Sequence, residues 1–135
     1  MITKLFFRVS NIDTGQGLWH DSDGTFSGLI HSKFKFCANS DLPMPFDSEL
    51  VGWLSVTEQL SDIWHWFTKE DVHRLQQHGW YVHGYHATIW KDHENHQVID
   101  VETSRPIFRL EVSSEGTMQN VTQVESPQRV ALTQN

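Results

Sequence analysis

The sequence predicts an α+β fold in which a mixed or mostly antiparallel sheet carries one or two packed helices. The first observation is a series of segments rich in β-branched and aromatic residues, which is typical of strands. They occupy residues 2–10, 25–37, 50–54, 80–90, 97–102 and 105–112. The second observation is a single helical block, residues 55–79, between the third and fourth of these segments. Strands on both sides of one helical block favour α+β over a regular β–α alternation.

The helical block begins where a short apolar run ends. Ser55 and Glu58 have the spacing of a capping box, so we expect the first helix to start there. The apolar residues that follow lie at i, i+3, i+4 and i+7 and predict one buried stripe: Leu60, Ile63, Trp64 and Phe67. Thr68 and Asp71 predict a second cap, followed by a short helix that Gly79 terminates.

Two other segments bear on the domain boundaries. Residues 39–47 include Pro43 and Pro45 and are predicted to be an irregular loop. Residues 113–135 have no aromatic residue, so we expect a disordered polar tail after one globular domain of residues 1–112. A chain of 135 residues is long enough for one core.

The composition limits the partners. The net charge of -7 leaves no basic patch for the phosphate backbone of duplex nucleic acid. No apolar stretch reaches membrane-spanning length, so no membrane contact is expected. Cys37 is the single cysteine and is expected to be a buried structural thiol in a reducing compartment, which favours a cytoplasmic location in a bacterial host. The oligomeric state stays open.

Nine histidines invite a zinc interpretation. However, His83 and His86 are three residues apart in a predicted strand, so they point to opposite faces and cannot readily share a metal. His93 and His96 lie in a predicted turn and could share one. Since structural or solvated histidines are the commoner case, we expect no metal.

The remaining candidate residues lie on or beside predicted strands: Arg8, Ser55, Thr57, Tyr81, Tyr85 and Glu102. An arginine in the first strand, a Ser/Thr-rich strand end and a late glutamate form an order that resembles ADP-ribosyltransferases. The resemblance implies NAD as cofactor, with Arg8 holding its phosphates or ribose and Glu102 as the catalytic carboxylate. It also implies that Ser55, Thr57, Tyr81 and Tyr85 contribute to the cofactor pocket. This chemistry is reasonable because a pyrophosphate needs a fixed cation and the glycosidic carbon becomes positive as nicotinamide leaves.

This chain departs from that family's pattern in two motifs. It has Ser55-Val56-Thr57 where the family has Ser-Thr-Ser, and Asp100-Val101-Glu102 is an imperfect counterpart of Glu-x-Glu. The wording "GLW-D-DG-F-GLIH" and "ELVGWLS" also resembles small uncharacterised proteins of phages and prophages. That likeness implies a mobile-element origin and no particular activity.

A single-stranded nucleic-acid binder that uses the tryptophans as stacking platforms is disfavoured by the acidic charge. Two further alternatives to the transferase hypothesis stay open. In the first, Arg8 pairs with an acid, Ser55 caps a helix and Glu102 ends a surface strand. In the second, the protein is a non-enzymatic accessory protein that binds a host protein through an acidic surface containing tryptophans. Residues 37–73 hold seven acids against the single Lys69, which favours such a surface.

Overall fold

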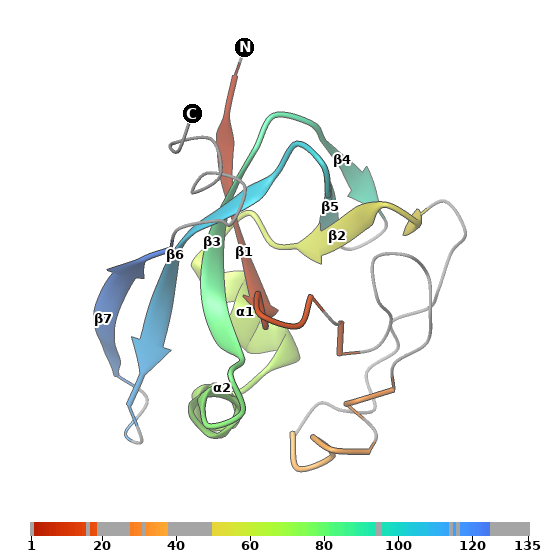
Figure 1. Ribbon diagram of the computed structural model, residues 1–135. Helices are drawn as coiled ribbons and strands as arrows, with labels where there is room; N and C mark the ends of the chain where they lie inside the picture. The colour runs from red at the N-terminus through yellow and green to blue at the C-terminus, as the bar shows by residue number, and fades with distance from the viewer. Residues whose placement is uncertain are drawn as a thin grey trace.

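The computed structural model describes residues 2–15, 17–18, 28–30, 32–37, 50–93, 96–113, 115 and 117–124. Two antiparallel sheets and two helices make up this part of the chain, which confirms the predicted α+β class (Figure 1). The first sheet contains β1 (Lys4–Ser10), β3 (Tyr81–Ala87), β6 (Arg105–Val112) and β7 (Met118–Gln123) in the spatial order β1-β3-β6-β7. The second contains β2 (Trp53–Val56), β5 (His96–Asp100) and β4 (Trp90–His93) in the order β2-β5-β4.

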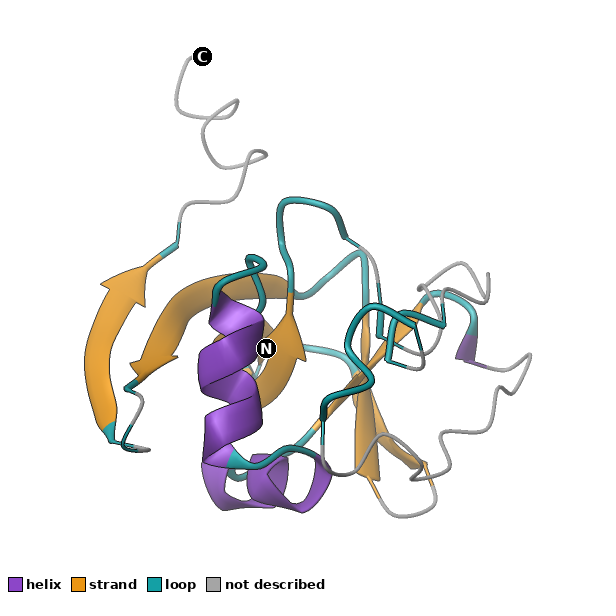
Figure 2. Ribbon diagram, turned by 90° about the horizontal axis from the view of Figure 1, so that it is seen from below, coloured by secondary structure: helices purple, strands orange, loops and turns teal. Residues whose placement is uncertain are grey.

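The two helices, α1 (Leu60–Trp66) and α2 (Lys69–Gln76), lie together on one side of the first sheet (Figure 2). The predicted capping box of α2 is confirmed, because Asp71 donates its backbone N–H to Thr68 Oγ1 at 3.0 Å and accepts from the Thr68 N–H at 3.2 Å. The predicted capping box at Ser55 is wrong. Strand β2 continues to Val56, and α1 begins after Gln59, which makes no side-chain capping bond.

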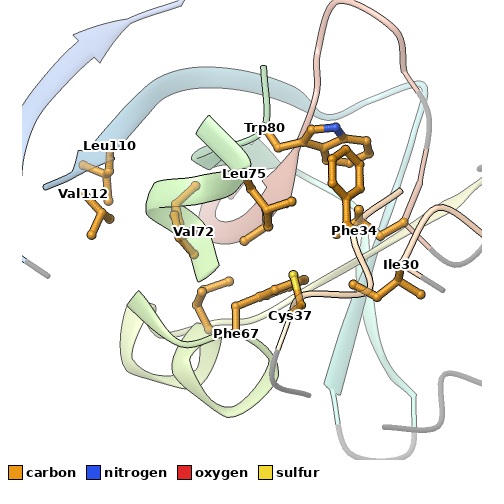
Figure 3. Packing of buried hydrophobic residues seen from close by; sticks show 13 residues of the cluster. Ile30, Phe34, Cys37, Phe67, Val72, Leu75, Trp80, Leu110 and Val112 are labelled. Carbon is orange, nitrogen blue, oxygen red and sulfur yellow. The ribbon is translucent and has the colours of Figure 1, made fainter. Parts of the chain in front are cut away.

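The main core cluster fills the space between the helices and the first sheet (Figure 3). Its buried members are Val9, Leu18, Ile30, Phe34, Cys37, Ile63, Phe67, Val72, Leu75, Trp80, Val82, Leu110 and Val112. The predicted α1 stripe is confirmed in phase, since Ile63 and Phe67 are buried and Leu60 and Trp64 pack half-buried against the cluster.

Residues 32–37 contribute to this core without forming the predicted strand. They fold into consecutive turns, in which Phe34 donates its N–H to the Leu29 carbonyl at 2.8 Å and Cys37 donates to the Phe34 carbonyl at 3.1 Å. Local hydrogen bonds therefore satisfy backbone groups that a strand would have paired with a neighbour. Burial raises the pKa of the Cys37 thiol to about 12, so this cysteine is an unreactive part of the core.

A second, smaller cluster joins the two sheets. It contains Phe6, Val56, Tyr85, Ala87 and Ile99. Phe6 and Val9 belong to different clusters, so one face of β1 looks toward the helices and the other toward the second sheet. Phe7 and Thr57 exchange backbone hydrogen bonds of 2.8 and 2.9 Å, which hold β2 beside the outer edge of β1.

The prediction of a disordered tail from residue 113 is wrong for residues 118–123. This segment is β7, which pairs with β6 along most of its length. Residues 125–135, the loop at 39–47 and Trp19 lie outside the described residues. No helix within the described ranges combines the length and apolar character that a membrane span requires.

Candidate functional site

The face of the first sheet that turns away from the helices carries an unusual row of basic side chains. The strand register sets Arg8 of β1 opposite His83 of β3, and His83 opposite Arg109 of β6. Neighbouring strands are about 4.8 Å apart, so the Cα atoms of the two arginines are separated by roughly 10 Å. We call this surface the polar face and define it by Arg8, Ser10, Tyr81, His83, Tyr85 and Arg109.

Ser10, His83 and Tyr85 form a hydrogen-bond network at the centre of the polar face. Ser10 Oγ is 2.8 Å from His83 Nδ1 and 2.9 Å from the Tyr85 hydroxyl. All three side chains are buried, and His83 is only 1% exposed. The network satisfies polar groups that would otherwise be costly to bury.

His83 is neutral in this environment. Burial lowers its pKa to about 4, and the positive charges of Arg109 and Arg8 contribute to the lowering. The strand register, which sets both arginines opposite His83, places their charges on the same part of the sheet. A neutral ring accommodates them because it adds no third positive charge to the row.

Arg8 is a half-buried cation with little compensation. Its Nη1 donates to the Ser55 carbonyl at 2.8 Å. A guanidinium has five N–H donors, and the described part of the chain offers Arg8 neither a second hydrogen bond nor a carboxylate. Burial accordingly lowers the pKa of Arg8 from its ordinary value. A half-buried positive charge of this kind is stabilised by an anion.

Arg109 stands at the more open end of the row, with its side chain 36% exposed. Its guanidinium carbon lies 4.3 Å from the centre of the Tyr81 ring, and its Nη2 lies 3.3 Å from Glu111 Oε1. Its buried Nε has no hydrogen-bond partner among the described residues. The stack on Tyr81 therefore fixes the plane of the guanidinium, and the buried Nε is not open to a ligand from outside.

The two hydroxyl residues expected beside Arg8 have other roles. Leu54 and Val56 pack into the smaller cluster, so Ser55 between them directs its side chain to the opposite face of the second sheet. There Ser55 Oγ lies 3.1 Å from His96 Nε2, and only the Ser55 carbonyl reaches Arg8. Thr57 is buried and donates its hydroxyl to the Gln59 carbonyl at 3.0 Å.

Glu102 is not brought to the polar face. It is exposed, in the turn that follows β5. In β6 the residue that lies in the same row as Arg8 is Arg109, which is seven positions after Glu102. Strand β6 starts at Arg105. The four residue steps from Arg105 to Arg109 alone span on the order of 13 Å in a strand. Of the predicted site residues, the structure thus groups Arg8, Tyr81 and Tyr85, and it separates Glu102 from them.

The described residues contain no group of three or more His, Cys, Asp and Glu side chains placed to hold a metal ion. His93 and His96 face each other at the end of the β4–β5 hairpin, with ring centres 5.7 Å apart. His96 is buried and contacts Trp66 as well as Ser55. This pair supplies two imidazoles, whereas a structural zinc site uses four protein ligands.

Two residues of the polar face were not predicted from the sequence: Ser10 and Arg109. His83 was expected only as a structural or solvated histidine. Arg109 carried a usable signal, because a charged residue between Phe108 and Leu110 in a strand segment must point away from the apolar face. Ser10 carried none, since its partners are more than 70 residues away.

Comparison with other proteins adds nothing to this geometry: no protein-family model, no curated protein and no solved structure matches the chain.

Proposed function

We propose that the protein binds a small anionic ligand, carrying a phosphate or carboxylate group, at the open end of the polar face. The observation that carries this proposal is the pair of arginines on one face of a chain that is acidic overall. Glu111 is the one carboxylate in hydrogen-bond contact with either guanidinium among the described residues. The remaining N–H donors match the oxygens of an oxyanion, and Tyr81 adds a flat ring beside them.

NAD is the first organic ligand to test, because its pyrophosphate has the required charge and because the order of residues along the chain resembles ADP-ribosyltransferases. Binding is the part of that hypothesis that the geometry supports. A transfer reaction would need a carboxylate directed at the developing cation. The exposed position of Glu102 gives no support for that role.

The experiment compares ligand binding in matched arginine variants. Inorganic phosphate and NAD are titrated into the wild-type protein by calorimetry at low ionic strength, because screening weakens exposed charge pairs. Arg8→Gln and Arg109→Gln each should weaken binding roughly tenfold or more, as expected for loss of a charge-assisted hydrogen bond.

Arg105→Gln is the control. Arg105 is exposed, lies on the same strand as Arg109 and pairs with His86, whose position in β3 alternates with that of Tyr85. This variant removes the same charge from the opposite face of the first sheet. Its affinity for phosphate and NAD should therefore equal that of the wild type. Equal binding by all three variants, or equal loss in all three, would contradict the proposal.

A second readout follows His83 itself. Sulfate keeps its charge through the pH range in which histidines titrate, so it is a suitable probe anion. Sulfate bound near Arg8 and Arg109 offsets their positive charge and should raise the pKa of His83, which NMR measures from the ring resonances. An unchanged titration curve at saturating sulfate would place the anion elsewhere.

The rival function, docking of a host protein on an acidic surface with tryptophans, has weaker support. No tryptophan is exposed among those that the structure describes. Trp53 and Trp64 lie beneath lysine ammonium groups, Lys91 at 4.5 Å and Lys69 at 5.4 Å from the ring centres. Each of these two rings therefore already makes a cation–π contact within the chain. A host-protein partner, a cytoplasmic location and a phage or prophage origin stay predictions.

A further inference from the structure

We propose that the outer edge of β7 pairs with the same edge of a second copy of this chain, so that two first sheets join into one continuous sheet. The two edges of this sheet differ. The edge at β1 is covered through the hydrogen bonds between Phe7 and Thr57. At β7, within the described ranges, strand pairing exists only with β6.

The alternation of hydrogen bonds along β7 shows which backbone N–H and C=O groups point away from β6. Val124 donates its N–H to the Ile107 carbonyl at 3.0 Å, which fixes that position as one that faces β6. In an antiparallel pair these positions alternate, so Thr122 also faces β6, whereas the N–H and C=O groups of Val121 and Gln123 point to the outer edge. Val121 is 69% exposed and stands at the middle of this edge.

The sequence of the edge selects a second copy as the occupant. Residues 118–124 read MQNVTQV, which is close to symmetric about Val121. An antiparallel pair with a two-fold axis at Val121 sets Asn120 opposite Thr122, Gln119 opposite Gln123, and Met118 opposite Val124. Every pair joins residues of the same kind, polar with polar and apolar with apolar, and this is what an isologous interface requires.

The distribution of charge also favours a second copy as the occupant of this edge. Two copies of a chain with net charge -7 repel each other, and a contact surface without acids limits that repulsion at the interface. Residues 117–124 contain no charged residue, in contrast to the inward charges and lysines that usually protect exposed edge strands.

The test uses the full chain and combines mass with cross-linking. Sedimentation equilibrium should show the wild type moving from one to two chain masses as concentration rises. Val121→Lys sets two like charges opposite each other at the axis and should weaken the dimer at least tenfold. Ile89→Lys changes another exposed aliphatic residue, 47% exposed and outside the first sheet, and should leave the dimer unchanged.

Cross-linking fixes the register. Residues that exchange both hydrogen bonds in an antiparallel pair have Cα atoms about 5.5 Å apart, within disulfide range. Val121→Cys should therefore form a disulfide-linked dimer under mild oxidation, whereas Asp62→Cys on the exposed side of α1 should not. The buried Cys37 stays unreactive in both variants. A wild type that remains monomeric, a dimer that survives Val121→Lys, or equal cross-linking by both cysteine variants would overturn the proposal.

Discussion

At the scale of single residues, His83 is held tightly by its surroundings. It is almost fully buried, bonded to Ser10, and flanked in its row by two arginines. Protonation would place a third positive charge where water cannot screen it. The imidazole therefore works as a neutral hydrogen-bonding group that orders the sheet face on which the arginines stand.

This environment predicts a specific pH dependence of stability. The pKa of His83 is about 4 in the folded protein and about 6.5 in the unfolded chain. Between these two pH values the unfolded chain therefore binds a proton at His83 that the native state does not bind. The free energy of unfolding should fall as the pH drops from 6.5 to 4, by on the order of 3 kcal/mol for this group. His83→Gln removes the titration, so urea unfolding across this range should show a shallower dependence in the variant. Parallel curves would mean that the pKa of His83 is the same in the native and unfolded states, which would contradict the prediction.

The sequence identified part of this site because some of its residues are conspicuous locally. Arg8 stands among strand formers, and Tyr81 and Tyr85 alternate along one strand segment. The contact of Ser10 with His83, and the placement of Arg8 and Arg109 on either side of His83, depend on the register of three strands that are distant in sequence. Periodicity gives the face of a residue but not its cross-strand neighbour. Glu102 was misplaced because β5 ends at Asp100 and the chain turns there.

At the scale of elements, the two caps show where local sequence decides and where it does not. Thr68 and Asp71 form their capping box because nothing competes for that turn. Ser55 and Glu58 have the same spacing, but residues 53–56 pair with β5 in a four-residue ladder. Sheet pairing and burial of Val56 stabilise the strand there, and tertiary structure overrides the local signal.

Strands β3 and β6 pack closely against each other at Gly84. A Cβ built on Gly84 would lie 2.3 Å from the Phe108 ring, closer than atoms can approach without movement. Gly84→Ala should therefore destabilise the fold by about 1–3 kcal/mol, the usual range for overpacking. Adding Phe108→Leu to Gly84→Ala should recover part of this loss, and a thermodynamic cycle in urea measures the coupling. Purely additive effects of the two substitutions would contradict the contact.

At the scale of the whole molecule, β7 shows why composition alone misjudged the end of the domain. Residues 113–124 have too little apolar area to fold alone, which is the basis of the disorder prediction. The partner strand β6 supplies what they lack, because it offers a ladder of backbone groups. Met118 packs against the main core cluster, beside the buried Val112. The globular unit therefore extends past residue 112.

Truncation measures how much that extension contributes. Removal of residues 113–135 deletes β7, uncovers the edge of β6 and takes Met118 away from the core cluster. The melting temperature should fall by several degrees, since a loss of about 1 kcal/mol lowers it by roughly 2–6 °C in a domain of this size. A second truncation, after Val124, keeps β7 and serves as the matched comparison. Both are measured at low protein concentration, so that any pairing of β7 edges does not contribute. If the shorter chain melts at the same temperature as the longer one, β7 adds nothing to stability and the folded unit ends at Val112.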